Sequence, residues 1–147
     1  MKLHFLRALI LLTVLMPMFR LQAADTAIHF IVNKDNPVTS LSAHDVADFF
    51  LKKQTRWPDG TPVRFIDWKE GSPVRVTFLE RIVGKSSREV ELYWIGQKLY
   101  TGDSAPVKVT SDALVVRFVS RFKGAIGFVG NPEAANFPGV RRIDVQK

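Results

Sequence analysis

Residues 69–75 hold the side chains best suited to binding chemistry, directly after an apolar stretch that is typical of a strand. Ser72 precedes a proline, a combination typical of a helix start, where the first backbone amides lack partners and the helix dipole is positive. Such a helix end favours a bound oxyanion. Gly71 and Ser72 would offer backbone amides and a hydroxyl, while Lys69 and Arg75 would add positive charge.

Two residues of this junction weigh against an anion site. Pro73 has no amide hydrogen to donate. Glu70 would repel an anion, although its carboxylate could accept the proton of monoprotonated phosphate. A purely structural alternative also stays open, in which Ser72 only caps its own helix, as serines at this position commonly do.

Three other segments could carry function, but each has a simpler structural explanation. The basic stretch 52–57 could bind acidic partners, yet a solvated loop with Trp57 packed on the core explains it better. Gly124 and Gly127 flank an apolar stretch, which predicts either close backbone packing or a nearby ligand, and packing is favoured. His44 lies near two aspartates, and a solvent-exposed helix face accounts for all three.

The composition excludes several classes of site. The chain has no cysteine and three histidines, none of them at metal-ligand spacing. Cysteine-based zinc sites, iron–sulfur clusters and thiol nucleophiles are therefore excluded. Neither a nucleophilic-serine motif nor a Walker-type phosphate loop occurs. A carboxylate pair for glycoside hydrolysis stays open, but nothing singles one out. We therefore expect no enzyme activity, no catalytic residues, no metal and no cofactor.

The N-terminus has the pattern of an export signal. Lys2 and Arg7 precede the apolar run over residues 8–19, and small residues follow where a signal peptidase could cut. A membrane anchor is the alternative, but a helix over residues 8–19 would cover roughly 18 Å, less than a ~30 Å hydrocarbon core. We expect a cleaved signal over residues 1–23 and a periplasmic domain over residues 24–147.

Removal of the signal changes what the charge implies. The formal charge of the chain falls from +7 to +4, because three basic residues leave with the signal. A strongly basic chain would suggest nucleic acid, but an exported protein rarely meets one. We expect no nucleic-acid partner, which leaves small anions, acidic glycans, anionic lipids or another protein.

Strands and helices alternate along the chain. Short β-branched or alternating stretches predict strands at residues 27–32, 63–67, 107–109, 125–129 and 140–145, the last as an edge strand. Serine caps and apolar residues at helical spacing predict helices over 43–51, from Ser72 to Gly84, and after Ser86 and Ser111. The alternation predicts an α/β sandwich without a second domain in the exported part.

Three segments together resemble the phosphate-binding proteins of bacterial ABC transporters, which have the type II periplasmic binding protein fold. Residues 31–52 are similar to the family's strand, Asn-Pro turn, helix and Ile-Phe-x-Gly-Lys stretch, and Trp57 stands in the place of a family tryptophan. Residues 70–73 resemble the family's phosphate loop, Asp-Gly-Ser-Gly-Thr. Residues 124–129 are close to its Gly-Ala-Ile-Gly-Tyr-Val motif. Their shared order and spacing make the resemblance fairly specific.

The chain also departs from the family pattern. Trp68 stands where the phosphate loop has an arginine, and Pro73 stands where it has a glycine. Lys52 and Lys53 replace a glycine–lysine pair. The chain has about half the length of a typical two-lobed receptor, so the resemblance implies a short, single-lobe member. The implied fold is α/β, one three-layer sandwich lobe with a mixed sheet and helices on both faces.

The resemblance implies a domain that binds an oxyanion, most simply phosphate, in ABC-type phosphate uptake or sensing. The residues implied to hold the anion are Gly71, Ser72, Lys69, Arg75 and Glu70. Implied partners are a transporter permease or a membrane sensor, and a second copy of the chain that would rebuild a two-walled cleft.

The alternative is a ligand-free interaction module that docks on a membrane sensor or transporter. Trp57, Trp68 and Tyr100 would form its anchor patch if they were exposed together.

Overall fold

The computed structural model describes residues 26–147, so the predicted export signal lies outside the described residues. Within this part, one sheet has the strand order β2-β6-β1-β5-β3-β4. The strands are β1 (His29–Asn33), β2 (Ser40–Ser42), β3 (Arg64–Trp68), β4 (Val107–Val109), β5 (Ala125–Val129) and β6 (Val140–Gln146). The helices are α1 (Ala43–Phe50), α2 (Pro73–Phe78), α3 (Ser87–Tyr100) and α4 (Asp112–Arg121), with a π-helical turn η1 (Leu79–Val83) and a 3₁₀ helix η2 (Pro132–Asn136).

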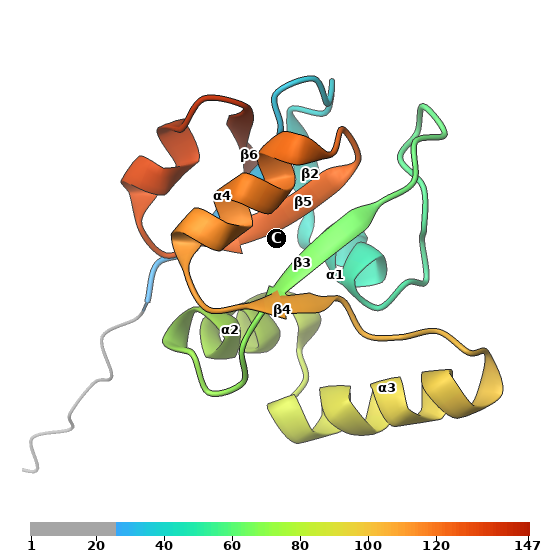
Figure 1. Cartoon of the computed structure of the whole chain (residues 1–147). Helices are drawn as coiled ribbons and strands as arrows, with labels where there is room; N and C mark the ends of the chain where they lie inside the picture. The colour runs from blue at the N-terminus through green and yellow to red at the C-terminus, as the bar shows by residue number, and fades with distance from the viewer. Residues whose placement is uncertain (1–25) are drawn as a thin grey trace, which may run out of the picture.

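The sheet mixes parallel and antiparallel pairs. β1 runs antiparallel to β5 and β6, whereas β3 is parallel to β5 and β4, and β2 is parallel to β6. Helix α4 lies across one face of the sheet, and α1 and α2 lie on the other (Figure 1). The predicted α/β lobe, with a mixed sheet and helices on both faces, is confirmed.

The core has two layers, because successive side chains of a strand point to opposite faces. On the face covered by α1 and α2, Phe128 stacks on Phe78 with ring centroids 4.3 Å apart, and Phe50 meets Phe78 edge-on at 5.1 Å. On the other face, a Cβ added to Gly127 would lie 2.7 Å from Val115 of α4. The predicted packing role of this glycine is therefore confirmed.

Side-chain caps set where three of the helices begin, as the sequence predicts. Ser42 and Asp45 form a capping box at α1, and Ser86 and Glu89 form another at α3. Ser111 accepts a hydrogen bond from the backbone amide three residues further on, at the start of α4. Each cap satisfies amides that would otherwise lack a partner, which stabilises the first turn.

One strand position differs from the prediction, and one helix changes character along its length. Strand β2 pairs with β6 on its outer side, so the prediction that β6 is an edge strand is wrong. A stretch as short as β2 shows no strand periodicity in the sequence. The helix that starts at Pro73 continues as the π-helical turn η1 and ends at Gly84, with φ 68°, at the predicted place.

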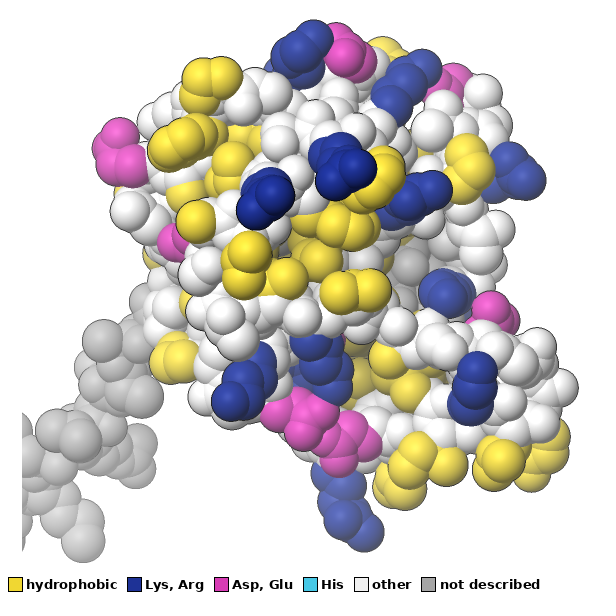
Figure 2. All heavy atoms as spheres, viewed as in Figure 1, with side chains coloured by type: hydrophobic (Ala, Val, Ile, Leu, Met, Phe, Trp, Pro, Cys, Tyr) yellow, Lys and Arg dark blue, Asp and Glu magenta, His cyan; other side chains and the backbone are white. Residues whose placement is uncertain are grey.

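Helix α3 buries one side and leaves the other in solvent. Val90 and Trp94 are buried, whereas Leu92, Ile95 and Leu99 are more than half exposed. Figure 2 shows hydrophobic side chains along the outer side of this helix. None of the helices in residues 26–147 combines the length and the hydropathy that a membrane span requires.

Acidification below about pH 6.5 is expected to destabilise the protein through His29. Its Nδ1 is buried without a hydrogen-bond partner. Burial, followed by the charge of Arg142, lowers the pKa of His29 from its ordinary value of 6.5. The unfolded chain therefore takes up this proton at a higher pH than the folded chain, so stability falls as the pH drops from 6.5 through the lowered pKa. Urea unfolding at about pH 7.5 and about pH 5.5 measures the effect. A His29→Gln variant should lose less stability than wild type, and equal losses would contradict this.

Candidate functional site

The loop between β3 and α2, residues 69–72, is a tight turn held by backbone hydrogen bonds. The Lys69 amide donates to the Val109 carbonyl of β4 at 2.8 Å, and the Ser72 amide donates to the Lys69 carbonyl at 3.2 Å. Gly71 has φ 77°, a left-handed conformation that favours glycine. Nothing lies within 4 Å of the Cβ that Gly71 lacks. The turn therefore leaves open space beside its glycine.

Ser72 stands directly before α2 but does not cap it. Its side chain makes no hydrogen bond with the first turn, in contrast to the caps of α1, α3 and α4. Its hydroxyl is buried and has no hydrogen-bond partner. A buried polar group without a partner costs on the order of 1–3 kcal/mol and calls for an explanation. The alternative that Ser72 only caps its own helix is therefore wrong.

Arg75 is buried, and its guanidinium links three elements. The side chain is 2% exposed. Its Nε donates to Oδ2 of Asp67 in β3 at 2.9 Å, and its Nη1 donates to the hydroxyl of Ser87 in α3 at 2.8 Å. Since Arg75 itself belongs to α2, these two bonds fix α2 against the strand and the next helix. Its positive charge is offset by Asp67.

Among the carboxylates of residues 26–147, Asp67 alone is buried. Burial raises the pKa of Asp67, and the charge of Arg75 opposes this rise. Asp67 also accepts a hydrogen bond from the Trp68 amide at 2.7 Å. A buried ion pair of this kind depends on both partners, because either one alone would be an uncompensated charge in the core.

Glu70 is paired with a cation that the sequence does not single out. Lys108 of β4 donates a hydrogen bond to Glu70. This hydrogen bond, together with the positive charge of Lys108, lowers the pKa of Glu70. The charges of Glu70 and Lys108 offset each other, as do those of the buried pair. Among the described residues Lys69 forms no ion pair, so it supplies the net positive charge of the loop.

A pocket of about 270 Å³ lies beside this loop. Gly71 and Arg75 line it from the loop and α2, Lys85 lines it from the segment before α3, and Ser87 lines it from the first position of α3. The structure thus brings two of the five predicted residues to one pocket wall. Lys85 and Ser87 join them where the chain leads into α3, and the hydrogen bond from Arg75 holds Ser87 there. No local sequence pattern records this contact.

The aromatic residues of the alternative hypothesis are not exposed together. Trp57 is 3% exposed and Trp68 is 7% exposed, and their indole N–H groups donate to the carbonyls of Gly124 and Phe128. Tyr100, at the end of α3, is 89% exposed. The predicted anchor patch is therefore wrong, whereas the prediction that Trp57 packs on the core is confirmed.

The remaining candidates also have structural explanations. A Cβ on Gly124 would lie 1.9 Å from the Pro62 carbonyl oxygen, so this glycine serves close packing. His44 and Asp48 are 3.3 Å apart on α1, with the His44 side chain in solvent. Within residues 26–147, no group of three or more histidine, aspartate or glutamate side chains is placed to hold a metal ion.

Comparison with known proteins defines the fold. No family model matches the chain, and no curated protein matches it significantly. An ABC-type phosphate transport receptor from Vibrio cholerae superposes with a TM-score of 0.61 at 17% identity, over 80% of this chain and 45% of the receptor. PstS from Borrelia burgdorferi gives 0.62 at 17% identity, over 81% and 47%. A structure with bound phosphate from Clostridium perfringens, described as a phosphate ABC transporter substrate-binding protein, gives 0.58 at 22% identity, over 80% and 44%.

These similarities show that the chain shares its fold with substrate-binding proteins of phosphate transporters, as the sequence resemblance implies. The fold of the chain is that of one α/β lobe of these proteins. The chain spans less than half the length of each of these structures, which agrees with the predicted single lobe.

Proposed function

We propose that this domain is a non-enzymatic, periplasmic binding domain that holds an oxyanion, phosphate, at the loop between β3 and α2. The observation that carries the proposal is Ser72, whose hydroxyl is buried before a helix without a partner in the fold. The phosphate receptors that share the fold support phosphate as the anion.

Three residues of the loop would contact the anion directly. The Ser72 hydroxyl would have to turn from its buried position toward the open side of the loop to donate to the anion, which would give it the partner that the fold lacks. The Gly71 amide and the free amides of the first turn of α2 donate further hydrogen bonds. Lys69 attracts the anion through its unpaired charge.

Two other residues, Glu70 and Arg75, would support the site. Glu70, kept ionised by its bond with Lys108, would accept a hydrogen bond from the hydroxyl of monoprotonated phosphate. Arg75 holds α2 in place through Asp67 and lines the adjacent pocket. Because Asp67 offsets its charge, Arg75 attracts an anion less than an unpaired arginine would.

We expect binding to be weak for a lobe of this kind. Lys69 and Gly71 are exposed to solvent, and water competes for the hydrogen bonds of an open site. A transporter permease or a membrane sensor of phosphate uptake is the proposed partner. A second copy of the chain is an alternative second wall for the site.

Replacing Ser72 with alanine is expected to abolish phosphate binding without destabilising the protein. Because the hydroxyl bonds to nothing in the fold, its removal should leave the melting temperature in phosphate-free buffer unchanged or slightly raised. Millimolar phosphate should raise the melting temperature of wild type but not that of the variant. Differential scanning calorimetry with and without phosphate measures both quantities.

Ser40→Ala is the matched control, because this serine lies in β2, away from the loop. It should keep the full phosphate-dependent rise. If Ser72→Ala instead lost about 1 kcal/mol of stability in phosphate-free buffer, the serine would be acting as a helix cap. That result would remove the main support for the anion site.

A second candidate function is the interaction module, and one observation favours it. Leu92, Ile95 and Leu99 lie on one side of α3 with more than half of each side chain in solvent. These residues replace the tryptophan patch as the surface that could dock on a membrane sensor or transporter. Capture of such a partner by the Ser72→Ala variant, with no phosphate bound by wild type, would favour this candidate.

A further inference from the structure

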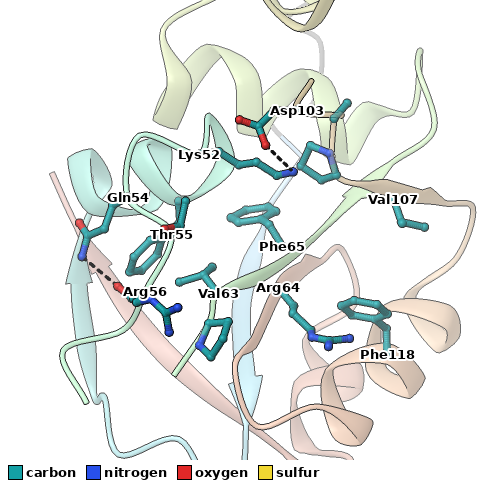
Figure 3. A pocket seen from close by; sticks show the side chains of 14 residues that line it. Lys52, Gln54, Thr55, Arg56, Val63, Arg64, Phe65, Asp103, Val107 and Phe118 are labelled. Atoms are coloured by element: carbon teal, nitrogen blue, oxygen red, sulfur yellow. Dashed lines mark hydrogen bonds and ion pairs between the residues drawn. The ribbon is translucent and has the colours of Figure 1, made fainter. Parts of the chain in front are cut away.

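A second pocket, of about 520 Å³, opens at the other end of β3 (Figure 3). Its walls come from the segment after α1, from Arg64 and Phe65 at the start of β3, from the segment before β4, and from Phe118 of α4. The proposed phosphate loop follows the last residue of β3, so the two sites are separated by the length of this strand. The volume lies within the range of small-molecule sites.

The floor of this pocket is apolar. Val63, Phe65, Pro106 and Phe118 line it. Figure 3 shows Val63, Phe65 and Phe118 arranged around the central space. Apolar and aromatic walls of this kind take up the hydrocarbon part of a ligand, because both surfaces leave water.

The rim is positively charged. Lys52, Arg56 and Arg64 line the pocket together with one carboxylate, Asp103. Arg56 is held by a hydrogen bond from its Nη1 to the Gly60 carbonyl at 2.8 Å, and Arg64 lies over the Phe122 ring at 4.3 Å. Among residues 26–147, neither arginine pairs with a carboxylate. The rim can therefore accept an anionic group.

Lys52, one of the three rim cations, has a strained backbone conformation. It has φ 55°, and among the described residues it is the one non-glycine residue with a positive φ. Residues other than glycine are strained in this backbone conformation. The side chain is 38% exposed and crosses the pocket toward Asp103 (Figure 3), where the two charged atoms are 3.9 Å apart. This distance is too long for a hydrogen bond, so the ammonium can still donate to a ligand.

We propose that this pocket binds a small organic anion, a carboxylate on an apolar body, with Lys52 as its main charged contact. The floor would cover the hydrocarbon part, and the carboxylate would lie at the rim that Lys52, Arg56 and Arg64 line. Inorganic phosphate would leave the apolar floor in contact with water, so it suits this pocket poorly. This second ligand is independent of the phosphate proposed for the loop before α2.

Calorimetric titration of the purified protein with octanoate tests the proposal. Saturable binding of octanoate is expected, together with no saturable binding of octanol, which has the same chain without the charge. Lys52→Gly should weaken octanoate binding about tenfold, the effect of losing one charge-assisted hydrogen bond. The same variant should melt at the wild-type temperature or above, because glycine relieves the backbone strain.

Lys53→Gly is the matched control, since it removes the same charge next in sequence from a residue that does not line the pocket. It should bind octanoate as wild type does, and so should Ser72→Ala. Equal binding of octanoate and octanol, an equal loss in both lysine variants, or no binding of octanoate to wild type would overturn the proposal. Competition by phosphate would overturn the separation of the two sites.

Discussion

Replacing Arg75 with methionine is expected to destabilise the protein by about 3–5 kcal/mol. The loss arises because Asp67, itself buried, would keep its charge in the core without the guanidinium that now lies 2.9 Å away. The hydrogen bond to Ser87, which connects α2 to α3, would be lost as well. Urea unfolding of the variant and of wild type at neutral pH measures the difference in the free energy of unfolding.

The pH dependence of this variant separates a lost charge pair from a simple packing defect. In the variant, burial without Arg75 raises the pKa of Asp67 further above its unfolded value of 3.8. A folded pKa above the unfolded one means that stability falls as the pH rises from the unfolded pKa through the folded pKa. The difference in the free energy of unfolding between the variant and wild type should therefore be smaller in acid than at neutral pH.

Two further variants serve as controls for Arg75. The double variant Asp67→Asn/Arg75→Met should recover much of the lost stability, because no buried charge remains. Arg88→Met, on the exposed surface of α3, should stay within about 0.5 kcal/mol of wild type. If Arg75→Met kept wild-type stability and lost only phosphate binding, Arg75 would be a ligand group rather than a structural one.

Replacing Gly124 with alanine is expected to cost at least about 2–3 kcal/mol. The new Cβ would lie 1.9 Å from the Pro62 carbonyl oxygen, which is backbone and cannot rotate away. The Gly124 carbonyl also accepts hydrogen bonds from the Arg64 amide and from the Trp57 indole, both at 2.9 Å. A shift of the backbone at this position would therefore disturb both the start of β3 and the hydrogen bond that holds the Trp57 indole.

Gly96→Ala is the matched control for this prediction. Gly96 lies within α3, and the Cβ that it lacks would meet nothing within 4 Å. Alanine there should stabilise the protein by about 0.5–1 kcal/mol, because glycine loses more backbone freedom on folding. Thermal unfolding of both variants gives the comparison. A Gly124→Ala protein as stable as wild type would show that β5 and the loop before β3 can move apart.

The elements with strong local signals were predictable from the sequence. The capping boxes at Ser42 and Ser86 and the cap at Ser111 gave the starts of three helices, because the cap residues bond to amides only a few positions away. The short strand β2 was not predictable, since it is defined by its pairing with β6 at the far end of the chain.

The candidate site was predictable as a segment but not as a geometry. The sequence places Lys69, Gly71 and Ser72 in a turn before a helix, and the structure has them there. The ion pair of Arg75 with Asp67 depends on how α2 packs against β3, which spacing alone does not reveal. The pairing of Glu70 with Lys108 likewise depends on the register of β3 beside β4.

The positive φ of Lys52 gives a physical reason for the glycine of the family pattern and shows that its replacement by lysine is costly. The family resemblance places a glycine at this position, and the left-handed backbone found here is the conformation that glycine adopts without strain. The sequence shows that the glycine is replaced, but only the structure shows that the replacement is strained and that its side chain lines a pocket.

A calorimetric titration tests the central claim most directly. It measures the heat of binding when phosphate is added to the purified wild-type protein at constant ionic strength. The account predicts saturable binding with one site per chain and a Kd on the order of 1 mM or tighter. Chloride at the same ionic strength should give no such signal. An absence of binding heat, with no change in melting temperature at millimolar phosphate, would contradict the proposal that the loop before α2 is an oxyanion site.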